Sequence, residues 1–189
     1  MFATARAWAA HGERRYCRPP MATPTITIRP ATVADAESIR AIYNREVTTA
    51  TSTFDLVPRT LVDQERWITA RSGAFSAIAA VAGPAPGAVV GFASLSPYKD
   101  RAAYSTTVED SVYVDRAMTG GGVGTLLLSN LVEIATASGF HSVIARIEAS
   151  GTASRALHAK CGFELVGIER QVGRKFNRWL DVAVMQRLL

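Results

Sequence analysis

The stretch from Thr107 to Gly139 constrains this chain most, because it reads as a strand, a glycine loop and a helix in direct succession. β-Branched and aromatic residues between positions 108 and 114 predict a strand that ends at the turn-prone Asp115. Glycines follow at positions 120, 121, 122 and 124. Apolar residues then recur at helical spacing as far as Gly139, which predicts a helix that ends there. The segment thus presents a glycine loop at the N-terminus of a helix.

This loop is suited to binding an anion. Its backbone N–H groups and the dipole of the following helix favour negative charge, and residues without side chains let a phosphate approach the backbone. A Walker loop does not fit, because Thr125 rather than a lysine follows the last glycine. A dinucleotide fingerprint also fits poorly, since its third glycine would fall at Thr125 or Leu127. A flexible turn needs fewer glycines, so we expect a phosphate or pyrophosphate site.

Glu109 is a candidate general base. It lies on the expected strand among residues that look buried, Val108, Val112 and Val114. Partial burial raises the pKa of a carboxyl toward the range that suits a base. The alternative interpretation is an exposed, solvated carboxylate, which is the more common case on a strand. A carboxylate within one strand's length of an anion site favours chemistry on a phosphorylated cofactor.

Composition argues against several other classes of protein. The 189 residues suffice for one domain with a sizeable core. The net charge is +5, but residues 1–20 hold four arginines against one glutamate, and the remaining positive charge is too scattered to predict nucleic-acid binding. No apolar run approaches the ~18 residues of a membrane span. Two cysteines favour a reducing cytosol and hence a cytoplasmic protein, and three histidines without ligand spacing predict no metal site.

The first 22 residues differ in composition from the rest of the chain. They are rich in alanine and arginine and include Cys17-Arg18-Pro19-Pro20. One interpretation is a targeting peptide; the one we favour is a disordered leader or an upstream start codon, with Met21 as the natural start. No long apolar segment is present, so a secretory signal is not expected. We therefore expect a leader over residues 1–22 and a single domain over residues 23–189.

Strands and helices alternate in the remainder. Strands are predicted at 25–29, 77–82, 88–94, 108–114, 143–147, 163–168 and 180–186, with a turn at 83–87. Helices are predicted after a cap at Thr32 or Asp35, at 60–71, from 123 to Gly139 and at 152–160, and a loop at 48–55. This order combines an antiparallel meander with two crossover helices. It predicts an α/β chain with a mixed sheet flanked by helices.

Two basic segments interleave cations with aromatic side chains. They comprise Tyr98, Lys99, Arg101 and Tyr104 in the first, and Arg174, Lys175, Phe176, Arg178 and Trp179 in the second. One interpretation is two solvated loops. The other is a pocket with aromatic walls and cationic ends, suited to a small anionic ligand.

Residues 25–189 resemble the GCN5-related N-acetyltransferases, and within them the phosphinothricin and methionine sulfoximine acetyltransferases. The resemblance rests on motifs in order, among them Ile28-Arg29-Pro30-Ala31-Thr32, Thr53-Phe54-Asp55, Arg101-Ala102-Ala103-Tyr104, Thr107 through Val114, Gly162-Phe163 and Val172-Gly173-Arg174-Lys175-Phe176. These motifs are specific for the subfamily and less specific for the substrate. The implied fold is that of acyl-CoA N-acyltransferases, a central mixed sheet with splayed strands flanked by helices.

The resemblance implies that acetyl-CoA binds between the strands at 108–114 and 143–147, with no metal. Backbone groups of the first strand would bind the pantetheine arm, and the glycine loop would bind the pyrophosphate. The implied cofactor-binding residues are Val112, Tyr113, Val114, Thr119, Gly120, Gly121, Gly122, Val123, Gly124, Thr125, Gly151 and Ser154. Thr119 stands where the family has Gln or Arg, and Gly151 stands where Asn is usual. Each departure would remove one polar contact to the cofactor.

The resemblance also implies a substrate pocket, completed by the loop from Gly173 to Trp179 and by a homodimer interface. Its implied residues are Phe54, Lys99, Arg101, Tyr104, Glu109, Asp110, Ser111 and Lys175. Glu109 would act as the base, and a backbone N–H near Val114 would stabilise the oxyanion. His158 occupies a position where relatives commonly carry a tyrosine that protonates the leaving thiolate, so it is our candidate acid. A lone histidine of this kind is more often a packing or surface residue.

We therefore expect acetyl transfer from acetyl-CoA to the α-amine of a small amino-acid analogue of the phosphinothricin, methionine sulfoximine or methionine sulfone type. Such an amine is mostly protonated at neutral pH and needs a base before it can attack a thioester. Lys99 and Arg101 favour an anionic acceptor over a polyamine. Two alternatives remain: acetylation of another amine, such as a polyamine or a protein N-terminus, and a non-catalytic acyl-CoA-binding sensor.

Overall fold

The structure, a computed structural model, describes residues 25–189. The expected leader, residues 1–22, and the expected start of the domain at residue 23 lie outside the described residues. Within them, the order of strands and helices is the one predicted from the sequence. No helix of residues 25–189 is long and apolar enough to cross a membrane.

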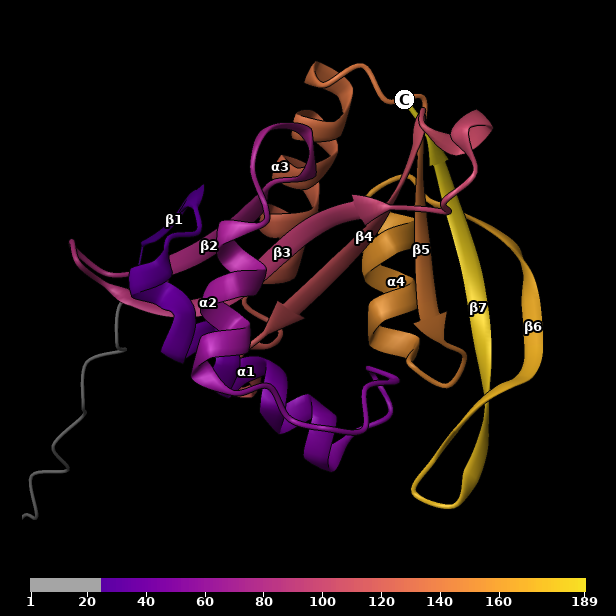
Figure 1. Cartoon of the computed structure of the whole chain (residues 1–189), viewed down its shortest axis with the longest axis horizontal. Coiled ribbons are helices and arrows are strands. Elements are labelled where there is room, and N and C mark those ends of the chain that lie inside the picture. The colour runs from indigo at the N-terminus through magenta and orange to yellow at the C-terminus, as the bar shows by residue number, and fades with distance from the viewer. Residues whose placement is uncertain (1–24) are drawn as a thin grey trace, which may run out of the picture.

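Seven strands form one mixed sheet, in the spatial order β1-β2-β3-β4-β5-β7-β6 (Figure 1). Their bounds are β1 Ile26–Pro30, β2 Ala77–Ala82, β3 Ala88–Pro97, β4 Thr107–Val114, β5 Ser142–Glu148, β6 Glu164–Lys175 and β7 Arg178–Leu188. All neighbouring pairs are antiparallel except β4 and β5, which are parallel. The mixed sheet predicted from the alternation of elements is confirmed.

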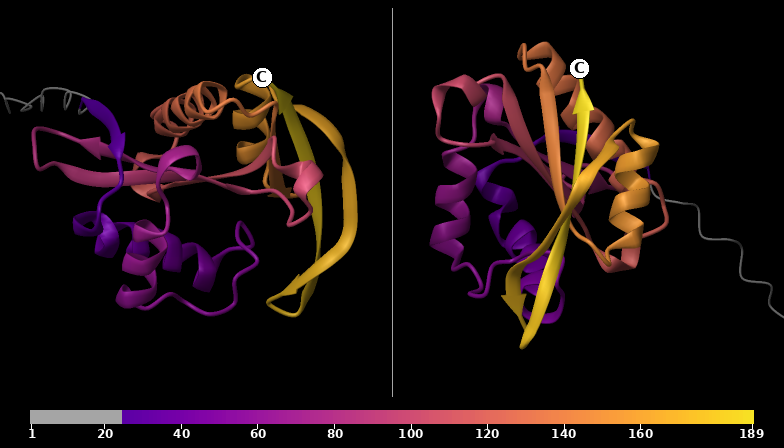
Figure 2. Two further views of the ribbon diagram at one scale, coloured as in Figure 1. Left: turned by 45° about the horizontal axis from the view of Figure 1, so that its top comes forward. Right: turned by 90° about the vertical axis from the view of Figure 1, so that its right-hand side faces the viewer.

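Helices cover both faces of the sheet (Figure 2). Their bounds are α1 Ala36–Thr49, α2 Leu61–Thr69, α3 Val123–Ala137 and α4 Thr152–Lys160. On one face α1 and α2 bury Ile39, Tyr43 and Ile68 against Phe92 of β3. On the other, the apolar stripe of α3, which includes Leu127, packs fully buried against the sheet. Two hydrophobic cores therefore hold the sheet between two helical layers.

The central feature of the sheet is the short pairing between β4 and β5. Their register contains only Thr107↔Ser142, Val108↔Val143 and Glu109↔Ile144. Beyond Glu109, β4 continues to pair with β3, and β5 continues to pair with β7 as far as Glu148. The two strands diverge from this point (Figure 1). The splayed strands that the family resemblance implied are therefore present.

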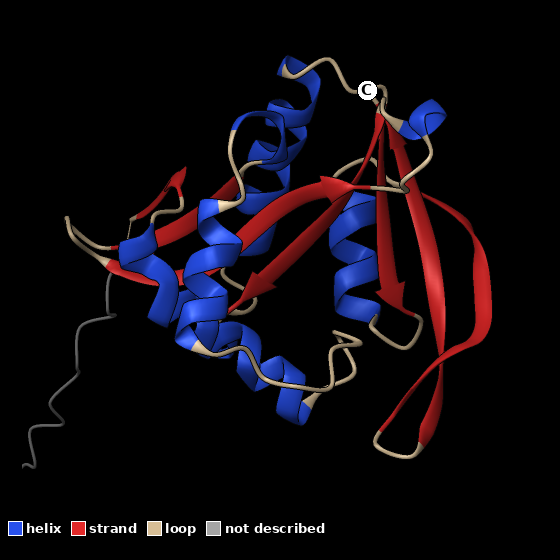
Figure 3. Ribbon diagram, in the orientation of Figure 1, coloured by secondary structure: helices blue, strands red, loops and turns tan. Residues whose placement is uncertain are grey.

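Several elements run further than the sequence predicted. The segment expected as a loop between Gly173 and Trp179 belongs mostly to β6 and β7, which form a long hairpin (Figure 3). Its turn is only two residues, Phe176 and Asn177, both with positive φ as a tight hairpin turn requires. Residues 169–175 are mostly exposed and polar, so they lack the alternation that signals a strand. The helix α1 likewise extends to Thr49, into the expected loop.

The entry to α1 is fixed by a buried carboxylate. Asp35 accepts two hydrogen bonds of 2.7 Å from the Arg29 guanidinium. It also accepts hydrogen bonds from the Thr32 backbone N–H at 2.8 Å and the Thr32 hydroxyl at 3.0 Å. The hydrogen bonds from Arg29, helped by those from Thr32, outweigh burial and lower the pKa of Asp35 below its usual value. The carboxylate thus joins β1 to the first turn before α1.

We predict that Asp35→Asn lowers the free energy of unfolding by about 2 kcal/mol at pH 7, because a neutral amide replaces a buried carboxylate that accepts hydrogen bonds from Arg29 and Thr32. A depressed folded-state pKa contributes stability above the unfolded pKa of about 3.9, and that contribution is lost as the pH falls through the folded-state value. The deficit should therefore shrink between pH 5 and pH 3 in chemical denaturation. Glu37→Gln, which disrupts the exposed pair with Arg40, is the control and should change little. A deficit that is constant with pH would contradict this account.

Candidate active site

A cleft of about 1000 Å³ lies where β4 and β5 diverge. Its lining comes mainly from the end of α1, the 50–54 loop, β4 from Glu109 onward, the segment from Arg116 to the start of α3, the end of β5, and α4. The cleft therefore begins at the last residue of β4 that pairs with β5. It runs toward the N-termini of α3 and α4.

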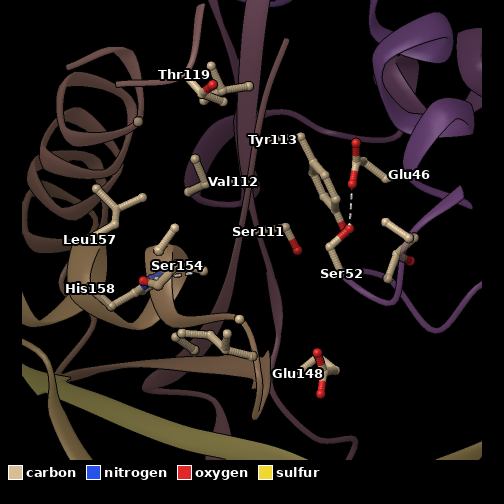
Figure 4. Close-up of a pocket in the computed structure, with 18 of the residues that line it drawn as sticks. Glu46, Ser52, Ser111, Val112, Tyr113, Thr119, Glu148, Ser154, Leu157 and His158 are labelled. Atoms are coloured by element: carbon tan, nitrogen blue, oxygen red, sulfur yellow. Dashed lines mark hydrogen bonds between the residues drawn. The ribbon is translucent and has the colours of Figure 1, made fainter. Parts of the chain in front are cut away.

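The cleft is open to both faces of the sheet, because side chains of β4 alternate between them. Asp110 points toward α4, where it meets His158. Tyr113 points toward α1, where its ring contacts Tyr43. In Figure 4, His158 lies on one side of β4, and Ser52, from the loop after α1, lies on the other. Two ligands that enter from opposite faces can meet at the splay.

The predicted cofactor-binding residues lie on β4 and along the side of the cleft nearest α3 and α4. All of them line the cleft except Gly121. Gly122 is the residue before α3; its φ is +82°, and a Cβ at this position would meet no atom within 4 Å. The helix N-terminus thus faces open space. Backbone N–H groups at this end and the helix dipole suit an anionic group, so the residues present fit a pyrophosphate.

The two departures from the family pattern have local explanations. The Thr119 hydroxyl donates a hydrogen bond of 2.8 Å to the Arg116 carbonyl, so it is directed at the backbone. Gly151 closes a tight turn in which its N–H donates to the Glu148 carbonyl at 2.8 Å. A Cβ at Gly151 would lie 3.0 Å from that same carbonyl oxygen. A side chain here would therefore force the turn between β5 and α4 to shift.

Glu109 is half-buried and lines the cleft on the side of α1 and α2. Burial raises the pKa of its carboxyl above the usual value; the nearby Arg146 opposes this effect, and the charges of Asp110 and Glu169 add to it. Ser111, also predicted as a substrate residue, lies two residues further along the same face. A carboxyl with a raised pKa at the start of the splay has the environment expected of a general base.

Phe54 reaches the cleft from the loop after α1, as predicted. Its ring packs so closely on Gly173 of β6 that a Cβ at Gly173 would overlap it. Another link between this loop and the sheet is the Thr51 hydroxyl, which donates to the Glu148 carboxylate at 3.1 Å. The loop is therefore held against β5 and β6 on the side of the cleft that faces α1.

His158, the predicted acid, lines the cleft from α4. It is buried, its Nε2 lies 3.0 Å from Oδ2 of Asp110, and its Nδ1 lies 2.7 Å from the Ser154 carbonyl oxygen. Burial alone would lower the pKa of His158, but the hydrogen bond and charge of Asp110, together with the hydrogen bond to the Ser154 carbonyl, outweigh burial and raise it. Both ring nitrogens thus have protein partners. The pair ties α4 to β4 and occupies Oδ2 of Asp110, a residue predicted to bind substrate, while the buried Oδ1 has no hydrogen-bond partner among the described residues.

Four residues predicted for the substrate pocket lie outside the cleft lining. Lys99, Arg101 and Tyr104 belong to the segment between β3 and β4, where the Lys99 ammonium lies over the rings of Tyr98 and Tyr104. This segment leaves the sheet beyond the paired ends of the two strands. Lys175 is buried, and its ammonium donates to the Thr53 carbonyl at 2.7 Å. It positions the 50–54 loop rather than contacting the cleft.

Two charged residues that were not predicted from the sequence, Arg146 and Glu148, also line the cleft. Arg146 and Glu148 lie on β5 on the same face as Glu109, because Glu109 pairs with Ile144 and alternate residues share a face. A single arginine within the apolar strand at 143–147 was the available signal. Among residues 25–189, no group of three or more His, Cys, Asp or Glu side chains is placed to hold a metal ion.

Comparisons with known proteins agree with this architecture. Residues 28–184 match the acetyltransferase (GNAT) domain family. The chain is 42% identical over 160 residues, 85% of this chain and 92% of the relative, to an L-methionine sulfoximine/L-methionine sulfone acetyltransferase of Pseudomonas paraeruginosa. It is 36% identical over 168 residues, 88% of this chain and 98% of the relative, to a phosphinothricin N-acetyltransferase of Streptomyces coelicolor.

Solved structures of acetyltransferases also have the same fold as this chain. A GNAT superfamily phosphinothricin acetyltransferase from Sinorhizobium meliloti, in complex with acetyl-CoA, superimposes with a TM-score of 0.82 at 38% identity. The match covers 87% of this chain and 89% of that one. A ribosomal-protein-alanine N-acetyltransferase from Brucella melitensis gives a TM-score of 0.81 at 38% identity, over 86% of this chain and 99% of that one. With its splayed β4 and β5, its glycine loop and these relatives, the chain belongs to the GNAT acetyltransferase family.

Proposed function

We propose that this protein transfers an acetyl group from acetyl-CoA to the α-amine of a small amino-acid analogue of the phosphinothricin, methionine sulfoximine or methionine sulfone type. The observation that carries the proposal is Glu109, a half-buried carboxylate at the point where β4 and β5 part. The names of the relatives supply the acceptor class.

Acetyl-CoA supplies a thioester carbonyl as the acetyl donor. Backbone groups of Val112 to Val114 would bind its pantetheine arm, since among the described residues β4 has no partner strand on that side after Glu109. The N–H groups from Gly120 to Thr125, at the start of α3, would bind its pyrophosphate. A backbone N–H near Val114 would stabilise the developing oxyanion.

Glu109 would take the proton from the acceptor's ammonium group, directly or through water. Its raised pKa is closer to the pKa of the amine than that of an ordinary carboxyl, which improves the driving force of proton transfer. Asp110 and His158 act as a positioning pair, because they hold α4 against β4 beside the cleft.

A homodimer in the cytoplasm is part of the proposal. Exposed apolar side chains gather on the β6–β7 hairpin, among them Leu165, Val166, Val172 and Trp179. Such side chains on neighbouring strands favour contact with a second copy of the chain.

The test is a thiol-release assay with acetyl-CoA and a panel of acceptors. The panel holds phosphinothricin, methionine sulfoximine, methionine sulfone, spermidine and an alanyl peptide. We expect kcat/KM for at least one amino-acid analogue to exceed that for spermidine and for the peptide by at least about tenfold, roughly the effect of one charge-assisted contact. Better turnover of spermidine or of the peptide would contradict the acceptor class. Binding of acetyl-CoA without turnover of any acceptor would favour the sensor alternative.

We predict that Gly122→Val weakens acetyl-CoA binding by at least about tenfold, because a side chain would occupy the open space at the N-terminus of α3. Gly139→Val is a matched control: Gly139 follows the other end of α3, its φ is +79°, and a Cβ there would also meet no atom within 4 Å. Both variants should lose similar thermal stability because both strain a left-handed backbone. Calorimetry should show reduced affinity only for Gly122→Val; equal affinity in the two variants would contradict the placement of the pyrophosphate.

We predict that Glu109→Gln lowers kcat by roughly 10²- to 10⁴-fold with little change in the Kd of acetyl-CoA, as expected when a general base is removed. In the wild type, activity should fall as the pH drops through the pKa of Glu109, which lies above the ordinary carboxyl value. That acidic limb of the kcat profile should be absent from the variant. Glu133→Gln, at an exposed position on α3, is the control. Full kcat with an unchanged pH profile in Glu109→Gln would show that the base lies elsewhere.

A further inference from the structure

Arg146 is a cation that lines the cleft on the side facing α1 and α2. Its neighbours on β5, Ala145 and Ile147, are buried against the core that contains α3. The Arg146 side chain therefore points to the other face, the face that Glu109 shares through its pairing with Ile144. It lines the cleft, and 42% of the side chain is exposed.

The partner of Arg146 is exchangeable. Its guanidinium forms a salt bridge with Glu169 of β6, whose side chain is also 42% exposed. Exposed pairs contribute little net stability, because water and salt compete for both charges. The pair between Arg29 and Asp35 differs, since only 6% of the Asp35 side chain is exposed. A ligand carboxylate can thus replace Glu169 at Arg146 with little loss of folding stability.

The other basic side chains that line the cleft are placed differently. Arg116 follows β4 and is held against α1 by Glu46 at 2.8 Å and by the Thr49 hydroxyl at 2.9 Å. Lys160 belongs to α4, on the opposite face of the sheet. Arg116 therefore lies on the same side of the sheet as Glu109, but its partner Glu46 is only 15% exposed, whereas the partner of Arg146 is 42% exposed.

The opposite charges of Arg146 and Glu109 on one face of the cleft suit an α-amino acid. Arg146 is near enough for its charge to act on the Glu109 carboxyl. An α-amino acid carries its ammonium and carboxylate groups on the same carbon, so it presents opposite charges to two such side chains. Guanidinium binds carboxylate through two parallel hydrogen bonds, which fixes the orientation of the ligand as well as its charge.

We propose that Arg146 determines acceptor specificity by binding the α-carboxylate of the acceptor in exchange for Glu169, which places the α-amine beside Glu109. This inference rests on the proposed function and assigns to Arg146 the role that the sequence predicted for Lys99 and Arg101. Those two residues, outside the cleft lining, lie between β3 and β4.

The test compares methionine sulfone with its neutral α-carboxamide in the wild type, Arg146→Ala and Arg146→Lys. For Arg146→Ala we expect KM for the acid to rise about 10- to 100-fold, the loss that removal of a charge-assisted pair produces. Its KM for the carboxamide and its KM for acetyl-CoA should not change. Arg146→Lys should recover part of the loss, because an ammonium keeps the charge but not the two parallel bonds. Equal changes for acid and carboxamide would overturn the proposal.

Glu169→Gln provides the opposite test, since it removes the carboxylate that competes with the acceptor. We expect its KM for the acid to fall and its KM for the carboxamide to stay constant. A rise in both would show that the salt bridge only supports the fold, and would overturn the proposal. Arg170→Ala removes an exposed arginine from the same strand and is the control.

Failure of this proposal is distinguishable from failure of the proposed function. If the wild type acetylates no amino-acid analogue, the function itself is contradicted. If the wild type prefers the acid to the carboxamide and Arg146→Ala keeps that preference, the assignment of Arg146 alone is contradicted.

Discussion

The early end of pairing between β4 and β5 is the constraint on which the rest of the site depends. After Glu109↔Ile144 the backbone groups of two adjacent strands no longer satisfy one another, which a folded chain accepts only when other contacts hold the gap open. On one face the buried contact between Asp110 and His158 fixes α4 to β4. On the other, the loop after α1 is fixed by the hydrogen bond from Thr51 to Glu148.

The same divergence sets the electrostatics of the site. Glu109 is the last residue of β4 that pairs with β5, so its side chain is partly buried by the sheet and partly exposed to the cleft. Burial raises its pKa, while Arg146 limits the rise. A more deeply buried carboxyl would stay protonated at neutral pH, and a fully exposed one would be a weak base. The position at the start of the splay therefore links the topology of the sheet to the proposed proton transfer.

Local patterns in the sequence were sufficient to predict most strands and helices but not the contacts between them. The bounds of β2 and α4 agree with the prediction, because a short apolar run before a turn and a glycine-bounded helical run are local signals. The end of β6 was missed, since polar residues form a strand there only through pairing with β7. The contact between His158 and Asp110 joins residues that are 48 positions apart, so no local pattern indicates it.

The residues that would bind the substrate were also hard to predict, because their positions depend on contacts between distant parts of the sequence. Lys99 and Arg101 are close to Glu109 in sequence, yet the segment that carries them leaves the sheet beyond the ends of β3 and β4. Arg146 is 37 positions from Glu109 in the numbering, and only the parallel register brings the two residues to one face. The glycine loop was predictable because a helix N-terminus and its flanking residues are contiguous in the chain.

A crystal structure of the protein with CoA and methionine sulfone is the most direct test of the central claim, that the splay joins a donor and an acceptor from opposite faces of the sheet. The account predicts CoA between β4 and β5, with its pyrophosphate at the N-terminus of α3 and the amine of methionine sulfone beside Glu109 on the face of α1 and α2. CoA bound outside the splay, or the acceptor bound on the face of α3 and α4, would contradict it.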